Sequence, residues 1–278
     1  MLINFQTLPF QDKLLPLVIK MKSEELVNFI TTDIGKIALY QKQNQSTKTP
    51  IIFLHGVYFD HHLWDEIIDK INDRTVISID MPLHGQSKEM NKHNWNLHDC
   101  AEMLIQILDT LQLKKVIAVG HSWGSMTILR AANIKSERFE SILLCNMPFK
   151  AATKKRKLIF RLQHAMLLFR DFYTKQVAKA LFRTSSLKDN PTLFNQLKRP
   201  MQLLTNNQIK QIDKQVIIDA EDTTTLINNL KIKTIGLKGE EDYVPKLPSI
   251  DTIIVKGGHI SPLEQPKEVL NLIQLISD

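Results

Sequence analysis

The chain has 278 residues, of which 43% are hydrophobic and 23% are charged, a composition typical of a globular protein with one sizeable core. No apolar run approaches the roughly 20 residues of a membrane-spanning helix, and the first 22 residues lack the basic start of a secretory signal, so we expect a cytoplasmic protein. The formal net charge of +7 belongs to one segment, 150–183, which holds ten Lys or Arg and one acid, Asp171. Because the rest of the chain is close to neutral and no recognition motif accompanies the charge, nucleic-acid binding is not expected.

Short β-rich segments alternate with helical patterns along the chain. EELVNFITTD followed by GKIALYQ predicts a hairpin that leads into a sheet. Strands are predicted at 36–41, 50–56, 75–82, 114–120, 141–148, 232–239 and 251–258. Helical spacing of apolar residues predicts helices at 63–71, 97–113, 124–134 and 264–276. Several strands are apolar throughout, as in parallel sheets buried on both faces, so the pattern predicts a doubly wound α/β architecture.

One long interruption breaks this alternation between two strand candidates. About 80 residues, 149–230, have mainly helical patterns, and an apolar stripe runs along their first part at helical spacing. The stripe consists of Leu158, Leu162, Met166, Phe169, Tyr173, Val177 and Leu181. We therefore expect a helical cap at 149–230, inserted into a core formed by 23–148 and 231–278, with residues 1–22 as an N-terminal extension.

The segment Gly120-His121-Ser122-Trp123-Gly124 ends a predicted strand and starts a predicted helix. Its G-x-S-x-G pattern permits the sharp, strained turn that lifts a serine hydroxyl clear of a sheet, with glycines where side chains would not fit. This context indicates a nucleophile. A serine that merely caps the first turn of the helix is the alternative.

A serine nucleophile needs a base and an acid that orients the base, and in this architecture both follow the serine on loops after later strands. After TIGLKG comes Asp242, with Glu240 and Glu241 beside it as alternatives, and after TIIVKGG comes His259. Another position for the acid, after an earlier strand, holds CNMPF without a carboxylate. The sequence therefore predicts a triad of Ser122, Asp242 and His259.

The oxyanion of a tetrahedral intermediate needs hydrogen-bond donors. One is expected from the backbone N–H of Trp123, directly after the serine, and another from that of Val57, which follows His55-Gly56. His55 is expected to shape its loop by hydrogen bonding rather than to transfer protons. The side chains expected to line the substrate pocket are Tyr58, Phe59, Met147, Leu162, Met166 and Phe169.

Five motifs are similar, in content and order, to those of the α/β-hydrolase superfamily: FLHGVYFDHHLW, IDMPLHGQS, VGHSWGS, LKGEEDYVP and GGHISPLEQP. The chain resembles the cap-bearing bacterial branch of esterases, lactonases, C–C bond hydrolases and acyl-carrier-protein methyl esterases. The resemblance runs from about residue 24 to the end and covers the cap in position only. It implies an eight-stranded, mostly parallel sheet with an inserted helical cap, and it implies the triad and oxyanion donors named above. Leu83 departs from the pattern, since relatives usually have glycine there.

A serine at this turn indicates acyl transfer to water, since related dehalogenases and epoxide hydrolases use aspartate and dienelactone hydrolases use cysteine. We expect hydrolysis of a carboxylic ester or lactone with an apolar acyl part, without a cofactor. Three alternatives stay open: an acyl-carrier-protein methyl ester as substrate, a C–C bond as substrate, and a non-catalytic ligand-binding protein on the same fold. The complete triad favours catalysis.

No metal site is expected from the sequence. The chain has no H-x-H-x-D-H cluster, and the histidines outside the triad, such as His61 and His62, lack metal-binding spacing. Cys100 and Cys145 lie inside apolar segments, which indicates structural burial. The basic segment 150–183 predicts an acidic carrier protein or an anionic surface as a partner, with simple solvation of the outer cap as the alternative.

Overall fold

The structure, a computed structural model, describes residues 27–277, so the expected extension at 1–22 lies outside the described residues. Its centre is an eight-stranded sheet in the order β1-β2-β4-β3-β5-β6-β7-β8. The strands are β1 (Val27–Thr31), β2 (Lys36–Lys42), β3 (Ile51–Leu54), β4 (Val76–Ile79), β5 (Val116–His121), β6 (Phe139–Cys145), β7 (Lys233–Gly239) and β8 (Thr252–Val255). β1 and β2 form the predicted hairpin, β2 also pairs antiparallel with β4, and the other neighbours are parallel. The predicted mostly parallel α/β sheet is confirmed.

The inner strands owe their continuous hydrophobicity to burial on both faces. All four residues of β3 and all six of β5 are buried. In the register, Leu54 at the end of β3 lies beside Gly120, and His121 at the end of β5 lies beside Cys145 at the end of β6. The carboxyl ends of these parallel strands therefore finish side by side, and the loops that follow them meet at one edge of the sheet.

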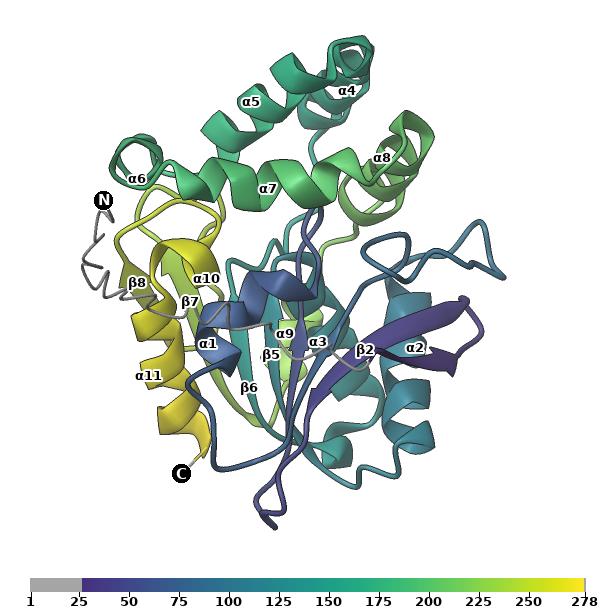
Figure 1. Cartoon of the computed structure of the whole chain (residues 1–278), viewed down its shortest axis with the longest axis vertical. Helices are drawn as coiled ribbons and strands as arrows, with labels where there is room; N and C mark the ends of the chain where they lie inside the picture. Colours follow the sequence, from purple (N-terminus) through teal and green to yellow (C-terminus); the bar gives the residue numbers. More distant parts are fainter. Residues whose placement is uncertain (1–26, 278) are drawn as a thin grey trace, which may run out of the picture.

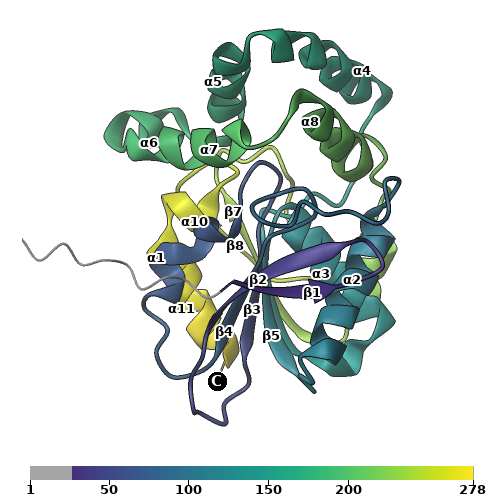
Figure 2. The same ribbon diagram turned by 45° about the vertical axis from the view of Figure 1, so that its right-hand side comes forward.

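Helices cover both faces of the sheet. One group consists of α2 (Leu97–Thr110), α3 (Trp123–Ile134) and α9 (Thr224–Asn229), and the other of η1 (His61–Trp64), α1 (Asp65–Ile68), α10 (Ser261–Glu264) and α11 (Pro266–Ser277). Figure 2 shows the two groups on opposite sides of the sheet. Asn96 caps α2: its side chain accepts hydrogen bonds from the N–H groups of His98 and Asp99 in a capping box. The apolar side of α2 packs on α3.

Apart from the short 3-10 helix η2 (Ser136–Arg138), which precedes β6, the remaining helices lie between β6 and β7. They are α4 (Lys154–Gln163), η3 (His164–Leu168), α5 (Arg170–Leu181), α6 (Thr184–Asp189), α7 (Thr192–Gln202), α8 (Asn206–Ile212) and the π-helix η4 (Asp213–Ile218). Figures 1 and 2 show α4 to α8 together above one edge of the sheet. α9 follows them and packs beside the sheet on α3, so the helices above the edge end with η4 at Ile218.

Both cysteines are buried, and neither forms a disulfide. Burial raises the pKa of the Cys100 and Cys145 thiols, so the reactive thiolate is suppressed at both positions. None of the helices within residues 27–277 has the length and apolar character needed to cross a bilayer.

Candidate active site

Ser122 stands at a strained turn between β5 and α3. Its backbone has φ 49° and ψ −107°, a conformation that L side chains rarely adopt. The flanking glycines have no room for a side chain: a Cβ on Gly120 would lie 2.5 Å from the backbone nitrogen of Ser125, and a Cβ on Gly124 would lie 2.1 Å from the carbonyl oxygen of Leu54. Close packing of the turn against β3 and α3 therefore explains why glycine stands on both sides of Ser122.

The structure brings Ser122, His259 and Asp242 together from three loops. His259 follows β8, and its Nε2 lies 3.0 Å from Ser122 Oγ. Asp242 follows β7, and its Oδ1 lies 2.9 Å from His259 Nδ1. Since the carboxylate only accepts hydrogen bonds, Nδ1 carries the proton, which leaves Nε2 as an acceptor for the serine hydroxyl.

The two acidic residues that precede Asp242 in the sequence form ion pairs outside the triad. Glu240 and Glu241 form ion pairs of 2.8 Å and 2.6 Å with Arg183, the residue before α6, so Asp242 is the acid that reaches His259. Burial alone raises the pKa of the Asp242 carboxyl, but the electrostatic interaction with His259 and the hydrogen bonds that the carboxylate accepts outweigh it. The pKa of Asp242 therefore lies below its ordinary value, and the carboxylate is ionised at neutral pH.

Asn146 is a site residue that sequence reasoning missed. It directly follows β6, and its Nδ2 donates hydrogen bonds to Asp242 Oδ2 at 2.8 Å and to the carbonyl oxygen of Gly258 at 3.3 Å. Its backbone has φ 50°, and its N–H donates to Leu237 of β7 at 2.7 Å. A polar residue at the end of a buried strand was the only signal in the sequence, and its meaning depends on β6 and β7 being neighbours.

Two buried histidines hold the loop that follows β3. His55 Nε2 accepts a hydrogen bond from the N–H of Met81 at 2.9 Å, and its Nδ1 donates to the carbonyl of Gly56 at 2.7 Å. His84 Nε2 accepts a hydrogen bond from the N–H of Tyr58 at 3.1 Å. Burial lowers the pKa of His55 to about 3 and that of His84 to about 4, so both rings are neutral supports of the loop.

The backbone N–H groups of Val57 and Trp123 are the expected oxyanion donors. Val57 lies on the loop held by these histidines and lines the same cavity as Ser122. Trp123 is the first residue of α3, so its N–H belongs to the unsatisfied first turn of a helix. Within residues 27–277 neither N–H donates to another atom of the chain, whereas the next ones along, of Tyr58 and Gly124, donate to His84 and His55.

A cavity of about 250 Å³ lies between the sheet edge and the cap. Ser122, His121 and His259 form its floor, and side chains of α4 and α5 form its roof. The roof includes Arg156, Ile159, Phe160, Gln163, Tyr173, Gln176, Val177, Ala180 and Leu181. The wall is mainly apolar, as in sites that bind an apolar group beside a few polar ones.

Two of the six predicted pocket residues, Tyr58 and Met166, line this cavity. Phe59 and Met147 are instead buried in the core, where Phe59 packs edge-on against His121. Leu162 and Phe169 point outward and are 65% and 69% exposed. The predicted stripe assumed one continuous helix, but the chain turns through the 3-10 helix η3 and a non-helical Phe169, which shifts the phase of the apolar face.

A buried polar network joins the cap to the loop after β3. The phenol of Tyr58 donates a short hydrogen bond to Asp213 Oδ1 in η4 and lies 3.1 Å from the hydroxyl of Tyr173 in α5. His164 Nε2 lies 2.8 Å from Asp213 Oδ2. Burial raises the pKa of Asp213 and raises that of Tyr58 well above its ordinary value, so the phenol stays a neutral donor.

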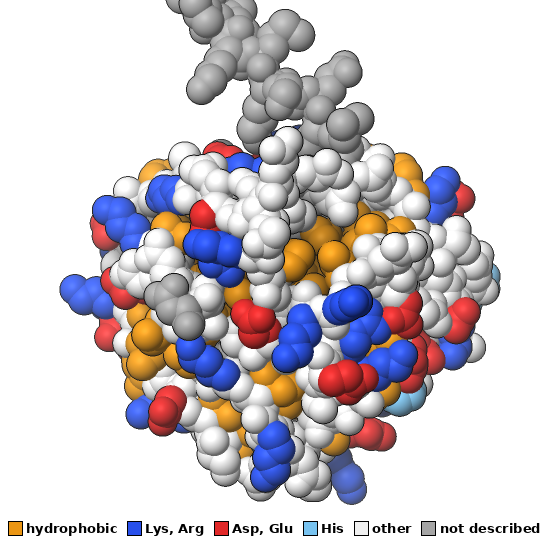
Figure 3. Space-filling model, turned by 90° about the horizontal axis from the view of Figure 1, so that it is seen from below, with side chains coloured by type: hydrophobic (Ala, Val, Ile, Leu, Met, Phe, Trp, Pro, Cys, Tyr) orange, Lys and Arg blue, Asp and Glu red, His pale blue; other side chains and the backbone are white. Residues whose placement is uncertain are grey.

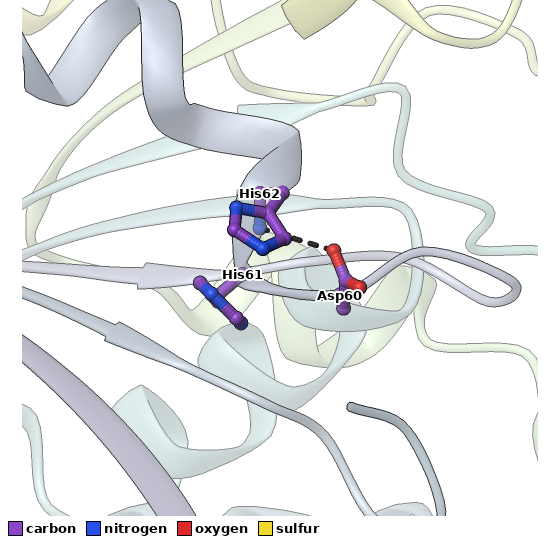
Figure 4. A group of neighbouring side chains, drawn as sticks. All are labelled: Asp60, His61 and His62. Atoms are coloured by element: carbon purple, nitrogen blue, oxygen red, sulfur yellow. Dashed lines mark hydrogen bonds between the residues drawn. The ribbon is translucent and has the colours of Figure 1, made fainter. Parts of the chain in front are cut away.

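The structure also groups Asp60, His61 and His62 around η1, which the sequence did not predict. Figure 4 shows the three side chains side by side. One potential metal-ligand atom of each lies within 4.8 Å of the others. Asp60 caps η1 by accepting a hydrogen bond from the N–H of His62. The Nδ1 atom of His61 lies 2.9 Å from a carboxylate oxygen of Asp80, and that of His62 lies 2.9 Å from a carboxylate oxygen of Asp65. These hydrogen bonds account for the grouping, and we assign no metal to it.

Comparison with known proteins establishes the family. The sequence profile of the family described as "alpha/beta hydrolase fold" matches residues 49–266, more than half of the chain. The chain belongs to the α/β-hydrolase fold family. This confirms the resemblance drawn from the five motifs.

Within this α/β-hydrolase family the chain is similar to esterases and lactonases. It is 28% identical to the esterase YbfF of Escherichia coli over 143 residues, which cover 51% of this chain and 55% of the esterase. It thus spans about half the length of the first curated relatives it matches. Two solved structures share the fold: a thermophilic esterase from Thermogutta terrifontis (TM-score 0.77, 20% identity, 90% of this chain and 97% of that chain) and the enol-lactonase from Burkholderia xenovorans (TM-score 0.78, 14% identity, 90% and 99%).

Proposed function

We propose that the protein is a serine hydrolase that cleaves a carboxylic ester or lactone with an apolar acyl part. The observation that carries the proposal is the alignment of Asp242, His259 and Ser122, with 2.9 Å between carboxylate and Nδ1 and 3.0 Å between Nε2 and the serine hydroxyl. Serine is a weak nucleophile until an adjacent base takes its proton, and the base needs a partner that fixes its tautomer. All three elements of that arrangement are present: Ser122 and His259 line the cavity, and Asp242 is buried behind His259.

In the proposed reaction, Ser122 Oγ attacks the carbonyl carbon while its proton passes to His259 Nε2. Asp242 stabilises the imidazolium that forms, and the N–H groups of Val57 and Trp123 stabilise the oxyanion. The proton then passes from His259 to the leaving oxygen as the C–O bond breaks, which leaves an acyl-serine. His259 next takes a proton from water, the hydroxide adds to the acyl carbon, and the proton returns to Ser122 as the acid departs.

The substrate class is inferred from the cavity. Its wall offers mainly apolar side chains to the acyl part, while Gln163, Gln176 and Arg156 supply the polar edge. Arg156 also lies over the ring of Tyr243, 4.4 Å from its centroid, and that ring stacks on His259. The names of the similar proteins, an esterase and an enol-lactonase, support the same class.

A cytoplasmic location belongs to this proposal. It is supported by Cys100 and Cys145, which are buried and unbonded, as is usual for proteins of a reducing compartment.

The test is covalent labelling of the nucleophile. A fluorophosphonate probe should attach to the peptide that contains Ser122, as mapped by mass spectrometry, and Ser122→Ala should abolish labelling. The same change should lower turnover of p-nitrophenyl butyrate by about 10³-fold or more while the far-ultraviolet circular dichroism is kept. Ser277→Ala, on α11 away from the cavity, is the matched control and should behave as the wild type. Labelling at another residue, or retained turnover in Ser122→Ala, would overturn the proposal.

A further inference from the structure

The cap has an outer side that faces away from the cavity. On α4, Arg156, Ile159, Phe160 and Gln163 line the cavity, and their spacing of three and four residues places them on one side of the helix. On α5, Tyr173, Gln176, Val177 and Ala180 do the same. Side chains on the opposite sides of these two helices therefore point away from the protein, at the end of the molecule that Figures 1 and 2 show at the top.

Large apolar side chains are exposed on this outer side. Of the thirteen large hydrophobic residues most exposed within residues 27–277, six lie between 158 and 172. Leu168 is the extreme case at 82% exposure, and Phe172 is 51% exposed. Leu158, Leu162, Leu168, Phe169 and Phe172 form the apolar part of what we call the outer cap face. Clustered exposed side chains of this size mark an interaction surface rather than ordinary surface composition.

Basic side chains lie on the same helices as this apolar part. Of the ten cations in 150–183, four have partners within the protein: Lys150 with Asp222, Arg156 with the Tyr243 ring, Arg170 with a backbone carbonyl of the cap, and Arg183 with Glu240. The other six, which form the basic part of the outer cap face, are Lys154, Lys155, Lys157, Arg161, Lys175 and Lys179.

None of these six cations has an ion pair with any residue in 27–277. The one acid of the segment, Asp171, is already paired with Lys198 at 3.2 Å. At the opposite end of the molecule, by contrast, basic and acidic side chains are intermixed, as Figure 3 shows.

We propose that the outer cap face docks on an anionic membrane surface. An interfacial helix inserts leucine and phenylalanine side chains at the boundary between headgroups and acyl chains, while its lysines and arginines contact anionic headgroups. Both kinds of side chain are exposed on the same short stretch of the cap, α4, η3 and α5. An acidic carrier protein would satisfy the cations but would leave five large apolar side chains against a polar partner, so the observations favour the membrane. Docking also brings the cavity roof, formed by the same two helices, close to the lipid surface.

The test is sedimentation of the full chain with lipid vesicles. Vesicles of phosphatidylcholine with about 30% phosphatidylglycerol should bind the protein at low ionic strength, pure phosphatidylcholine vesicles should bind it at least tenfold more weakly, and about 500 mM salt should weaken the binding. Leu162→Asn combined with Phe169→Asn should reduce binding at least tenfold. Lys155→Gln combined with Arg161→Gln should reduce it by a similar factor, since each cation near such a surface contributes about fivefold.

Matched controls separate the outer cap face from exposed hydrophobicity in general. Phe29→Asn combined with Leu275→Asn changes two similarly exposed side chains on β1 and α11 and should leave vesicle binding unchanged. Turnover of a water-soluble ester should be the same in all variants, because none of the changed residues lines the cavity, so this test is independent of the proposed function. Absence of binding to the anionic vesicles, or equal binding by the cap variants and the control, would overturn the proposal. Loss of binding in the charge variant alone, together with co-elution with an acidic carrier protein, would overturn it in favour of a protein partner.

Discussion

Tyr58, on the loop after β3, donates a hydrogen bond to the buried carboxylate of Asp213 in the cap, 155 residues later in the chain. Tyr58 has φ 71°, a conformation that is rare for a residue with a side chain, and it directly follows the proposed oxyanion donor Val57. The bond therefore links the position of the cap to the geometry of the loop beside the serine. Since burial raises the pKa of Tyr58 well above its ordinary value, this donor persists over the whole working pH range.

The first prediction concerns this link. Tyr58→Phe keeps the ring but removes the donor, leaving a buried carboxylate short of one partner. The free energy of unfolding should fall by about 1–3 kcal/mol, measured by urea denaturation. A double-mutant cycle with Asp213→Asn should give a coupling energy of about 0.5–3 kcal/mol, because the two residues share one hydrogen bond. Additive effects would mean that the contact contributes nothing of its own.

The second prediction concerns Asn146 as the residue that positions Asp242. Asn146→Ala removes the 2.8 Å hydrogen bond to Asp242 Oδ2. Hydrogen bonds to charged groups contribute about 1.5–3 kcal/mol, so kcat/KM for an ester should fall roughly 10- to 100-fold if this energy holds the triad in register. Asn133→Ala, which loses hydrogen bonds to α3 and α9 instead, is the control and should keep kcat/KM near the wild-type value. Equal losses in both variants would speak against a positioning role.

How much the sequence predicts depends on how local the cause is. The turn at Ser122 is recognisable because both glycines that it requires, Gly120 and Gly124, stand within two residues of the serine, although the atom that excludes a side chain at Gly124 belongs to the distant β3. The order of Ser122, Asp242 and His259 along the chain, each after a strand, similarly follows from a parallel sheet whose loops meet at one edge. Asn146 was missed because it meets Asp242 only when β6 and β7 are neighbouring strands. Nothing in the segment CNMPF itself indicates that pairing.

In the cap, the sequence pattern did not predict correctly which side chains face the cavity. The apolar stripe from 158 to 181 has helical spacing throughout, but the two α-helices are separated by η3, so a single phase does not hold across it. Leu162 and Phe169 consequently face outward, whereas Met166 between them faces the cavity. A sequence pattern fixes which residues share a face only within one uninterrupted helix.

The third prediction concerns pH and stability. The pKa of Asp242 is lower in the folded protein than its unfolded value of about 3.9, so the stability that its ionised form contributes is fully present above about pH 4 and is lost as pH falls through the lower folded pKa. Asp242→Asn cannot lose this contribution. The free energy of unfolding of the wild type should therefore fall more steeply between about pH 5 and pH 2 than that of Asp242→Asn. Parallel curves in urea titrations at each pH would contradict the assignment.

The last prediction concerns Leu83, which stands where relatives usually have glycine. Its φ of 69° strains any residue with a side chain, yet the leucine is buried and its turn carries His84, which holds the N–H of Tyr58. Losing the buried side chain costs about 2–5 kcal/mol, more than the roughly 1–2 kcal/mol that removing the strain restores, so Leu83→Gly should be less stable than the wild type.

Leu83→Ala loses the same packing but keeps the strain, so it should be less stable than Leu83→Gly by about 1 kcal/mol. This order of stability is the reverse of that expected inside a helix, where alanine stabilises the fold by about 1 kcal/mol more than glycine does. Leu104, which is fully buried in α2, provides the comparison: there the alanine variant should be the more stable of the two. Urea denaturation of the four variants measures both differences, and a Leu83→Ala variant more stable than Leu83→Gly would show that backbone strain does not decide the stability of this turn.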